Sequence, residues 1–167
     1  IDDNSNKENL SKINKLIKNS EINIEIINHK NENHINVIKK QKTKETFANL
    51  SSLLKCFEIG KDNGEDLVFF VEDDYLHFKT CLDEMISTYE RISSQANKDL
   101  FICPSDYPFL YMDNQKTTVL VGSNRHWRTI NKTLCTFLTS HNLIKKYWDN
   151  FHNSCIDRHD PFEKYLN

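Results

Sequence analysis

Three consecutive carboxylates follow an apolar stretch of the chain. Residues 67–71 are Leu-Val-Phe-Phe-Val, and Glu72, Asp73 and Asp74 come directly after them. A run of this kind is typical of a strand buried on both faces, and open α/β sheets bind ligands beyond the carboxyl ends of their strands. Because adjacent carboxylates repel one another, a divalent cation is their simplest partner, and Mg²⁺ or Mn²⁺ prefers such oxygen ligands. We expect Asp74 to touch the metal with help from Glu72, and Asp73 to orient a sugar or ribose hydroxyl; the alternative is a solvated acidic turn.

A second acidic group opens the chain. Asp2, Asp3, Asn4 and Ser5 stand between an inferred strand end and the start of a helix. A carboxylate there can accept hydrogen bonds from a base or from sugar hydroxyls, whereas the alternative is a simple helix cap. Because the chain begins with Ile1 and its first residues resemble the end of a buried strand, we expect it to be a fragment of a longer protein.

Further candidates lie in the second half of the chain. Asp106, between Pro104 and Pro108, could bind sugar hydroxyls or act as a base, or it could be a plain turn residue. Guanidinium groups suit bidentate contacts with phosphate, so Arg125 or Arg128 could hold a diphosphate. An aromatic side chain can stack on a sugar ring, and the aromatic candidates for such stacking are Tyr107 and Trp127. The alternative for Arg125, Trp127 and Arg128 is that two surface cations flank a tryptophan of the core.

Composition restricts the class of protein. With 167 residues, the chain is the size of one domain. The formal net charge is -2, so a nucleic-acid partner is not expected. No apolar stretch reaches the roughly 20 residues that span a bilayer. The five cysteines include no Cys-x-x-Cys pair, which indicates reduced thiols and a cytoplasmic protein, free or peripheral at a membrane face.

Hydrophobic periodicity predicts the elements that would position these residues. Helical spacing is found near Leu10–Ile17, where Asn4 or Ser5 could cap the helix, and alternation predicts a strand over residues 22–27. A helix is expected to end at Gly60. The remaining predicted elements are helices over about 45–59, 78–93 and 136–151, strands over 67–71, 100–103 and 117–121, and a polar turn over 122–128. This order predicts a single α/β sandwich.

The two acidic groups, separated by helix, strand and helix, together resemble a known family. Asp2–Ser5 is similar to the Asp-Asp-x-Ser signature of family-2 glycosyltransferases, and Glu72–Asp74 resembles their Asp-x-Asp motif, in the form also found in N-acetylglucosaminyltransferase I. The resemblance implies the GT-A fold, a Rossmann-like three-layer α/β/α sandwich with a mostly parallel sheet, here without its N-terminal strand. It also implies one domain over residues 1–167, with a nucleotide-sugar half over 1–76 and an acceptor half over 77–167.

The resemblance further implies roles for individual residues. Asp3, with Ser5 beside it, would contact the donor base, and Asp74 would hold the metal on the diphosphate. The donor would be a nucleotide-diphosphate sugar, with a uridine diphosphate sugar favoured, and the acceptor a glycan or a lipid-linked hydroxyl. Transfer would invert the anomeric centre by single displacement, with a carboxylate as base. The base candidates are Asp160, Asp157 and Asp106, and His159 or His126 would be a further metal ligand.

Three other classes of protein remain in competition. A non-catalytic nucleotide-sugar-binding module would keep the donor residues and lack a base. A metal-dependent phosphohydrolase could use the same carboxylates, although two-metal sites usually draw acids and histidines from several strands. A receiver domain also opens with an acidic pair, but it needs a Lys before a Pro on a late strand, and the sequence contains no Lys-Pro.

Overall fold

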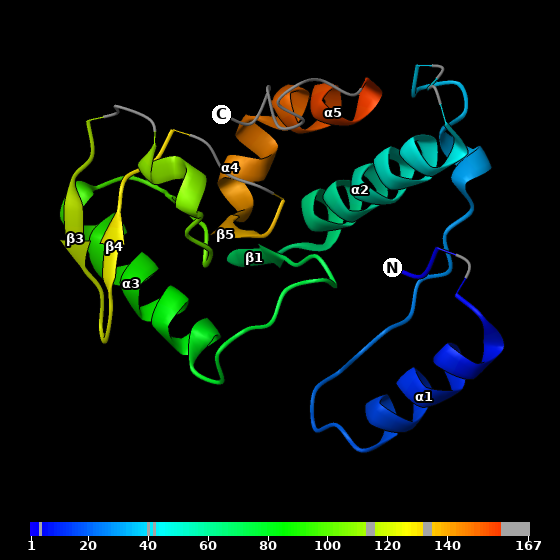
Figure 1. Cartoon of the computed structure of the whole chain (residues 1–167), viewed down its shortest axis with the longest axis horizontal. Coiled ribbons are helices and arrows are strands. Elements are labelled where there is room, and N and C mark those ends of the chain that lie inside the picture. The colour runs from blue at the N-terminus through cyan, green and yellow to red at the C-terminus, as the bar shows by residue number, and fades with distance from the viewer. Residues whose placement is uncertain (4, 40, 42, 113–115, 132–134, 158–167) are drawn as a thin grey trace.

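The computed structural model describes residues 1–3, 5–39, 41, 43–112, 116–131 and 135–157. Figure 1 shows the arrangement of the elements. In chain order they are α1 (Lys7–Lys18), η1 (Asn31–His34), α2 (Lys44–Asn63), β1 (Leu67–Phe70), α3 (Cys81–Ala96), β2 (Phe101–Ile102), η2 (Pro108–Tyr111), β3 (Val119–Val121), β4 (His126–Arg128), β5 (Phe137–Ser140), α4 (His141–Lys146) and α5 (Trp148–Ile156).

The sheets are small and antiparallel. In the three-stranded sheet β5 lies between β1 and β2 and runs antiparallel to both. The second sheet is the β3–β4 hairpin. The prediction of a GT-A, Rossmann-like sandwich with a mostly parallel sheet is therefore wrong. The physical reason is β5, which forms at the start of the segment predicted to be helical. It enters the sheet between β1 and β2 and runs antiparallel to both.

Strand β5 is the centre of the core. All four of its residues are buried, and its side chains alternate between the two faces of the sheet. Phe137 packs in one cluster with Phe57 of α2 and Phe151 of α5. Leu138 packs in a second cluster with Met85 of α3 and Ile102 of β2. Helices thus cover both faces of this short sheet, which explains why a strand of four residues is stable.

Helix α2 is longer than its sequence pattern predicts. It begins after Thr43, whose hydroxyl caps the Thr46 amide, and it continues through Gly60 to Asn63. Gly60 has a packing role instead of a terminating one. A Cβ at this position would lie 2.5 Å from Cζ of Phe70, so glycine lets the helix approach β1 closely.

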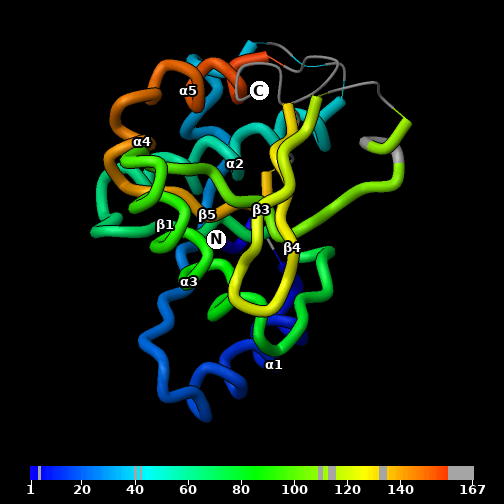
Figure 2. Tube along the Cα trace, turned by 90° about the vertical axis from the view of Figure 1, so that its left-hand side faces the viewer, coloured from blue at the N-terminus to red at the C-terminus, as the bar shows by residue number. Residues whose placement is uncertain are grey.

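The N-terminal region lies apart from the core. Helix α1 has no buried residue, and it projects from the remaining elements in both views (Figures 1 and 2). Its cap is Asn6, not Asn4 or Ser5. The strand predicted over residues 22–27 does not form; in its place one isolated parallel bridge joins Asp2 to Asn28. No helix among the described residues has both the length and the apolar character needed to cross a membrane.

Candidate functional site

A cavity of about 1090 Å³ lies between α3, β2 and the β3–β4 hairpin, closed on one side by the chain around residue 105. Its lining includes five of the residues singled out in the sequence, which are Asp106, Arg125, His126, Trp127 and Arg128. Pockets that bind small molecules usually measure about 300–1,000 Å³. The hairpin that carries four of these residues lies beside α3 in Figure 2, and this contact borders the cavity.

Asp106 and Arg128 form an ion pair within the cavity. Nη2 of Arg128 donates to Oδ1 of Asp106 at 2.8 Å, and its Nε lies 3.3 Å from both carboxylate oxygens. The hydroxyl of Tyr111 also donates to Asp106, and the guanidinium of Arg128 stacks on the Tyr111 ring at 4.3 Å. The hydrogen bonds from Arg128 are the main reason that the pKa of Asp106 is lowered, against the opposing effect of burial. A general base works best with a pKa near the operating pH, so these contacts suit Asp106 to positioning rather than to proton removal.

Glu84 fixes the hairpin onto α3. This carboxylate is buried, and it accepts hydrogen bonds from Nε1 of Trp127 at 3.2 Å and from the backbone amide of Asn124 at 2.8 Å. Burial by itself raises the pKa of Glu84, but the hydrogen bonds from Trp127, Asn124 and Thr88 outweigh it, and the net pKa is lowered. A Cβ on Gly122 would lie 2.3 Å from Oε1 of Glu84, so the turn can close only over a glycine.

Sequence reasoning missed Glu84, although one signal was present. It lies one turn from Cys81 and from Thr88, on the apolar side of α3, where a charged residue needs a partner. The orientation of Trp127 follows from this contact. Its indole nitrogen points to Glu84, which fixes the plane of the ring beside the cavity.

Arg125 lies at the rim of the same cavity. Its guanidinium stacks over the ring of Phe78 at 4.6 Å from the centroid. Phe78 is largely exposed, so this stacking holds a cation at the surface opening of the cavity. A guanidinium held in this way is suited to bind a phosphate or carboxylate group.

The acidic segment after β1 lies next to the chain that carries Asp106. The amide of Glu72 donates to the hydroxyl of Thr136 at 3.1 Å, and that hydroxyl lies 3.2 Å from the Glu72 carboxylate. A hydrogen bond between the hydroxyls of Tyr75 and Tyr107 joins the two segments. Burial, then the contact with Tyr107 and the negative charges of Glu72 and Asp74, raise the pKa of Tyr75. Asp73 and Asp74 themselves are exposed.

Within the described part of the chain, no three His, Cys, Asp or Glu side chains gather closely enough to hold a metal by themselves. Mg²⁺ is commonly bound by one or two carboxylates together with substrate phosphates. Glu72 and Asp74 supply oxygen ligands of the type that such a smaller set uses.

The N-terminal acidic residues have partners of their own. Asp3 accepts from Nδ2 of Asn31 at 2.8 Å and from the hydroxyl of Ser52 at 3.1 Å, which ties it to α2. Asp2 accepts from the amide of the exposed Ser5 at 3.1 Å. The large cavity is lined by α3 and not by α2, so the contacts of Asp3 do not place it beside Arg125 and Arg128.

The late base candidates are separated from the cavity or lie outside the described residues. Asp157 follows α5, where Nζ of Lys39 lies 3.6 Å from its carboxylate and Nε2 of Gln41 donates at 3.4 Å. It is not among the residues that line the large cavity. Asp160 and His159 fall outside the part of the chain that the structure describes.

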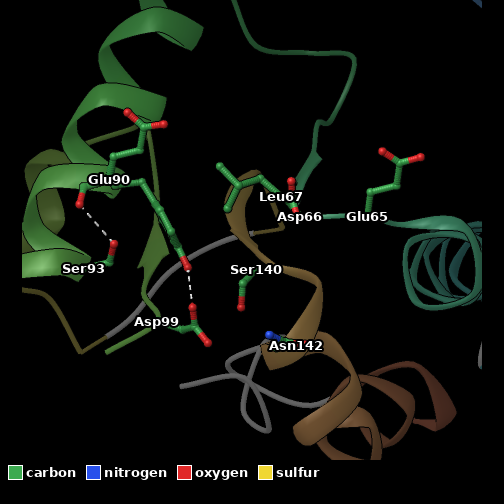
Figure 3. A pocket seen from close by; sticks show the side chains of 9 residues that line it. Glu65, Asp66, Leu67, Glu90, Ser93, Asp99, Ser140 and Asn142 are labelled. Atoms are coloured by element: carbon green, nitrogen blue, oxygen red, sulfur yellow. Dashed lines mark hydrogen bonds between the residues drawn. The ribbon is translucent and has the colours of Figure 1, made fainter. Parts of the chain in front are cut away.

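A smaller cavity of about 400 Å³ is strongly acidic (Figure 3). Several of its polar lining groups have partners within the protein. The hydroxyl of Tyr89 donates to Asp99 at 2.9 Å, and the hydroxyl of Ser140 caps α4 at the Leu143 amide. The carboxylates that line it are Glu65, Asp66, Glu90 and Asp99. We interpret it as a solvated acidic groove beside the end of the sheet.

The structure therefore gathers Asp106, Arg125, Trp127 and Arg128 around one cavity, with Tyr107 and the acidic segment beside it. Comparison of the chain with protein-family models, with curated proteins and with solved structures found no match. The site residues themselves must carry any functional conclusion.

Proposed function

We propose that the large cavity binds a nucleotide-diphosphate sugar, and that the chain belongs to a cytoplasmic glycosyltransferase. The observation that carries the proposal is the convergence of two arginines, an anchored indole and an acid on one cavity of suitable size. A uridine diphosphate sugar offers a matching set of groups, since it has two negative phosphates, hydroxyl-rich rings and a planar base. The acidic segment over residues 72–74 follows β1, and the hydrogen bond between Tyr75 and Tyr107 joins this part of the chain to the loop that carries Asp106.

Each lining residue has a role in this proposal. Arg125 binds a phosphate, because its guanidinium is held at the rim by Phe78. Trp127 stacks on a ring of the donor or of the acceptor, in the plane fixed by Glu84. Asp106 accepts hydrogen bonds from sugar hydroxyls while Arg128 keeps it ionised.

A divalent cation fits beside these residues. Glu72 and Asp74 would hold Mn²⁺ or Mg²⁺ together with the diphosphate of the donor. When bound, the cation would supply positive charge that stabilises the departing nucleotide diphosphate. The protein's own part is to fix Glu72, which Thr136 does through two hydrogen-bonding contacts.

In the reaction that we propose, a hydroxyl of a glycan or lipid-linked acceptor attacks the anomeric carbon with inversion. A carboxylate must remove the proton from that hydroxyl. Because the pKa of Asp106 is lowered by Arg128, we give Asp106 a positioning role and propose Asp160, which lies outside the described residues, as the base.

A non-catalytic nucleotide-sugar-binding module is the second candidate, and one observation favours it. Among the lining residues that the structure describes, the carboxylates are Glu84 and Asp106, and the pKa of each is lowered. Neither is suited to accept a proton near neutral pH. A chain with this cavity alone would bind the donor without transferring its sugar.

Calorimetric titration with uridine diphosphate, with and without Mn²⁺, tests the binding step. We expect Arg125→Gln to weaken binding by about 10- to 100-fold under both conditions, since a charge-assisted hydrogen bond is lost. Asp74→Asn should remove only the gain in affinity that Mn²⁺ provides. The matched controls are Arg91→Gln and Asp83→Asn, which change exposed residues on α3 and should bind as the wild type does.

Equal affinity in all variants, or no binding to the wild-type chain, would contradict the proposal. Release of free sugar from a panel of uridine diphosphate sugars then separates the two candidate functions. Hydrolysis that depends on Asp160 supports the transferase, whereas tight binding without turnover supports the binding module.

A further inference from the structure

Three potential metal ligands lie together at the start of α3. His77, Cys81 and Met85 are spaced four residues apart, so their side chains can share one side of the chain. Sγ of Cys81 lies 3.7 Å from Nδ1 of His77 and 3.7 Å from Sδ of Met85. A thiol, an imidazole and a thioether thus meet around the Cys81 sulfur.

The two distances match those between ligands of a three-coordinate metal ion. Metal bonds to nitrogen and sulfur measure about 2.0–2.3 Å. At the 120° angles of a planar three-coordinate site, bonds of that length place neighbouring donor atoms about 3.5–4.0 Å apart. Both contacts of the Cys81 sulfur fall within this interval.

The surroundings provide both rigidity and access. Met85 is fully buried and Cys81 is partly buried, while His77 is exposed. The imidazole of His77 packs edge to face on Phe69, with 6.0 Å between the ring centroids. Cys81 and Met85 line the large cavity, which gives an ion a path to the two sulfur atoms.

We propose that His77, Cys81 and Met85 form a binding site for a soft monovalent cation of the Cu(I) class. Thiolate and thioether sulfur select soft ions, whereas Mg²⁺ and Ca²⁺ prefer oxygen. Among the described residues, no three His, Cys, Asp or Glu side chains form a metal site. The site proposed here has one His and one Cys, and its third ligand is a methionine. The site lies on the wall of the same large cavity, but it does not require that the cavity bind a nucleotide sugar.

Charge balance distinguishes a monovalent ion from Zn²⁺. One thiolate with one monovalent cation gives a neutral centre. Zn²⁺ with the same ligands would leave a net positive charge close to Arg125, whose charge already acts on Cys81. Structural Zn²⁺ sites usually have four ligands. Here Cys81 and its two contacts, His77 and Met85, provide three.

Binding replaces the thiol proton by the metal. The S–H bond of Cys81 breaks, a sulfur–metal bond forms, and the proton passes to solvent, with no change in oxidation state. Burial raises the pKa of the free Cys81 thiol, so the unloaded residue is a poor nucleophile. A metal ion removes this barrier, because a coordinating thiol loses its proton outright.

The test is an anaerobic titration of the full chain with Cu(I), buffered by competition with bicinchoninate. Met85→Leu keeps the side-chain volume and removes only the thioether, and we expect it to weaken Cu(I) binding by about tenfold or more. Met112→Leu is the matched control, because Met112 is exposed and should not affect binding. Cys81→Ser should abolish the site, whereas Cys103→Ser, another cysteine of the cavity, should retain it.

X-ray absorption at the copper edge of the loaded wild-type chain gives a readout that does not depend on any variant. We expect two sulfur ligands and one nitrogen ligand, with the nitrogen lost in His77→Gln and kept in His152→Gln. Unchanged affinity in Met85→Leu, or a spectrum with a single sulfur, would overturn the thioether assignment. Zn²⁺ binding as tight as that of Cu(I) would overturn the class of ion.

Discussion

At the scale of single residues, two histidines and a serine illustrate how a buried polar group is satisfied. Nε2 of His29 lies 2.7 Å from the Ser51 hydroxyl, and Nδ1 of His34 lies 2.9 Å from the same oxygen. Nε2 of His34 contacts Glu58 at 3.3 Å. These contacts form one chain of hydrogen bonds through the Ser51 hydroxyl, which also lies 3.3 Å from the backbone oxygen of Asn31. This chain joins the segment over residues 29–34 to α2.

The hydrogen bonds around Ser51 predict that the protein loses stability at acidic pH. Burial first, and then the charge of His34 and of Lys55, lower the pKa of His29 against the opposing effects of Asp3 and Glu58. Because the pKa of His29 in the folded state lies below the unfolded value of 6.5, its contribution to stability is fully present above pH 6.5. It is lost as the pH falls through the lowered folded pKa. Urea unfolding at pH 8 and at pH 5 should therefore show a smaller free energy of unfolding at pH 5.

The His29→Gln variant separates this group from the other titrating residues. It should be less stable than the wild type at pH 8 and should lose less stability between pH 8 and pH 5. His152→Gln on α5 is the control and should keep the wild-type pH dependence. An identical pH dependence in His29→Gln and in the wild type would contradict the assignment to His29.

Residue types in the candidate site could be predicted from the sequence, but their pairing could not. Arg128 and Trp127 stood out because cations flank an indole, and Asp106 because it lies between prolines. The contact of Asp106 with Arg128 joins a loop to a strand of the hairpin. No local periodicity encodes such a contact, since it depends on how the hairpin packs on α3.

At the scale of elements, long amphipathic helices were predictable and short strands were not. The apolar stripe of α2, from Phe47 to Phe57, predicted a helix because about three turns repeat the same pattern. Strand β5 (Phe137–Ser140) is too short for hydrophobic periodicity to distinguish a strand from a helix. Its last residue, Ser140, caps α4, so the strand runs directly into a helix in the sequence. The alternating residues 22–27 have strand character but pair with no strand in the described part of the chain, and their backbone is irregular.

The contact between α2 and β1 predicts an unusual response to a helix-favouring substitution. Replacing a glycine within a helix by alanine normally stabilises it by up to about 1 kcal/mol. Gly60→Ala should instead destabilise the chain by about 1–3 kcal/mol, because the new Cβ would press on the buried ring of Phe70. Thermal and urea unfolding measure the difference.

Asn49→Ala is the matched control for this experiment. Asn49 is an exposed residue of the same helix, and its replacement should leave stability unchanged or slightly raise it. If Gly60→Ala were as stable as Asn49→Ala, the close approach of α2 to β1 would not exist in solution.

At the scale of the whole molecule, stability should be uneven. Helix α1 buries no side chain, whereas Leu50, Leu54 and Phe57 of α2 are almost completely buried. An isolated helix of this length is marginal in water. We therefore expect the amides of α1 to exchange with deuterium through local opening, and those of α2 only through global unfolding.

Hydrogen exchange followed by mass spectrometry or NMR over increasing urea checks this expectation. Exchange in α2 should follow the global free energy of unfolding, and exchange in α1 should be fast and nearly independent of urea. Equal protection of the two helices would show that α1 is packed against another surface in solution.

The central position of β5 also has a consequence during protein synthesis. Strands β1 and β2 emerge from the ribosome first, but each pairs with β5 and neither with the other. At synthesis rates of about 5–20 residues per second, the backbone edges of β1 remain unpaired for several seconds. An apolar edge exposed for that time can pair with another nascent chain. Early translation products of this protein should therefore depend on chaperones until Ser140 has left the exit tunnel.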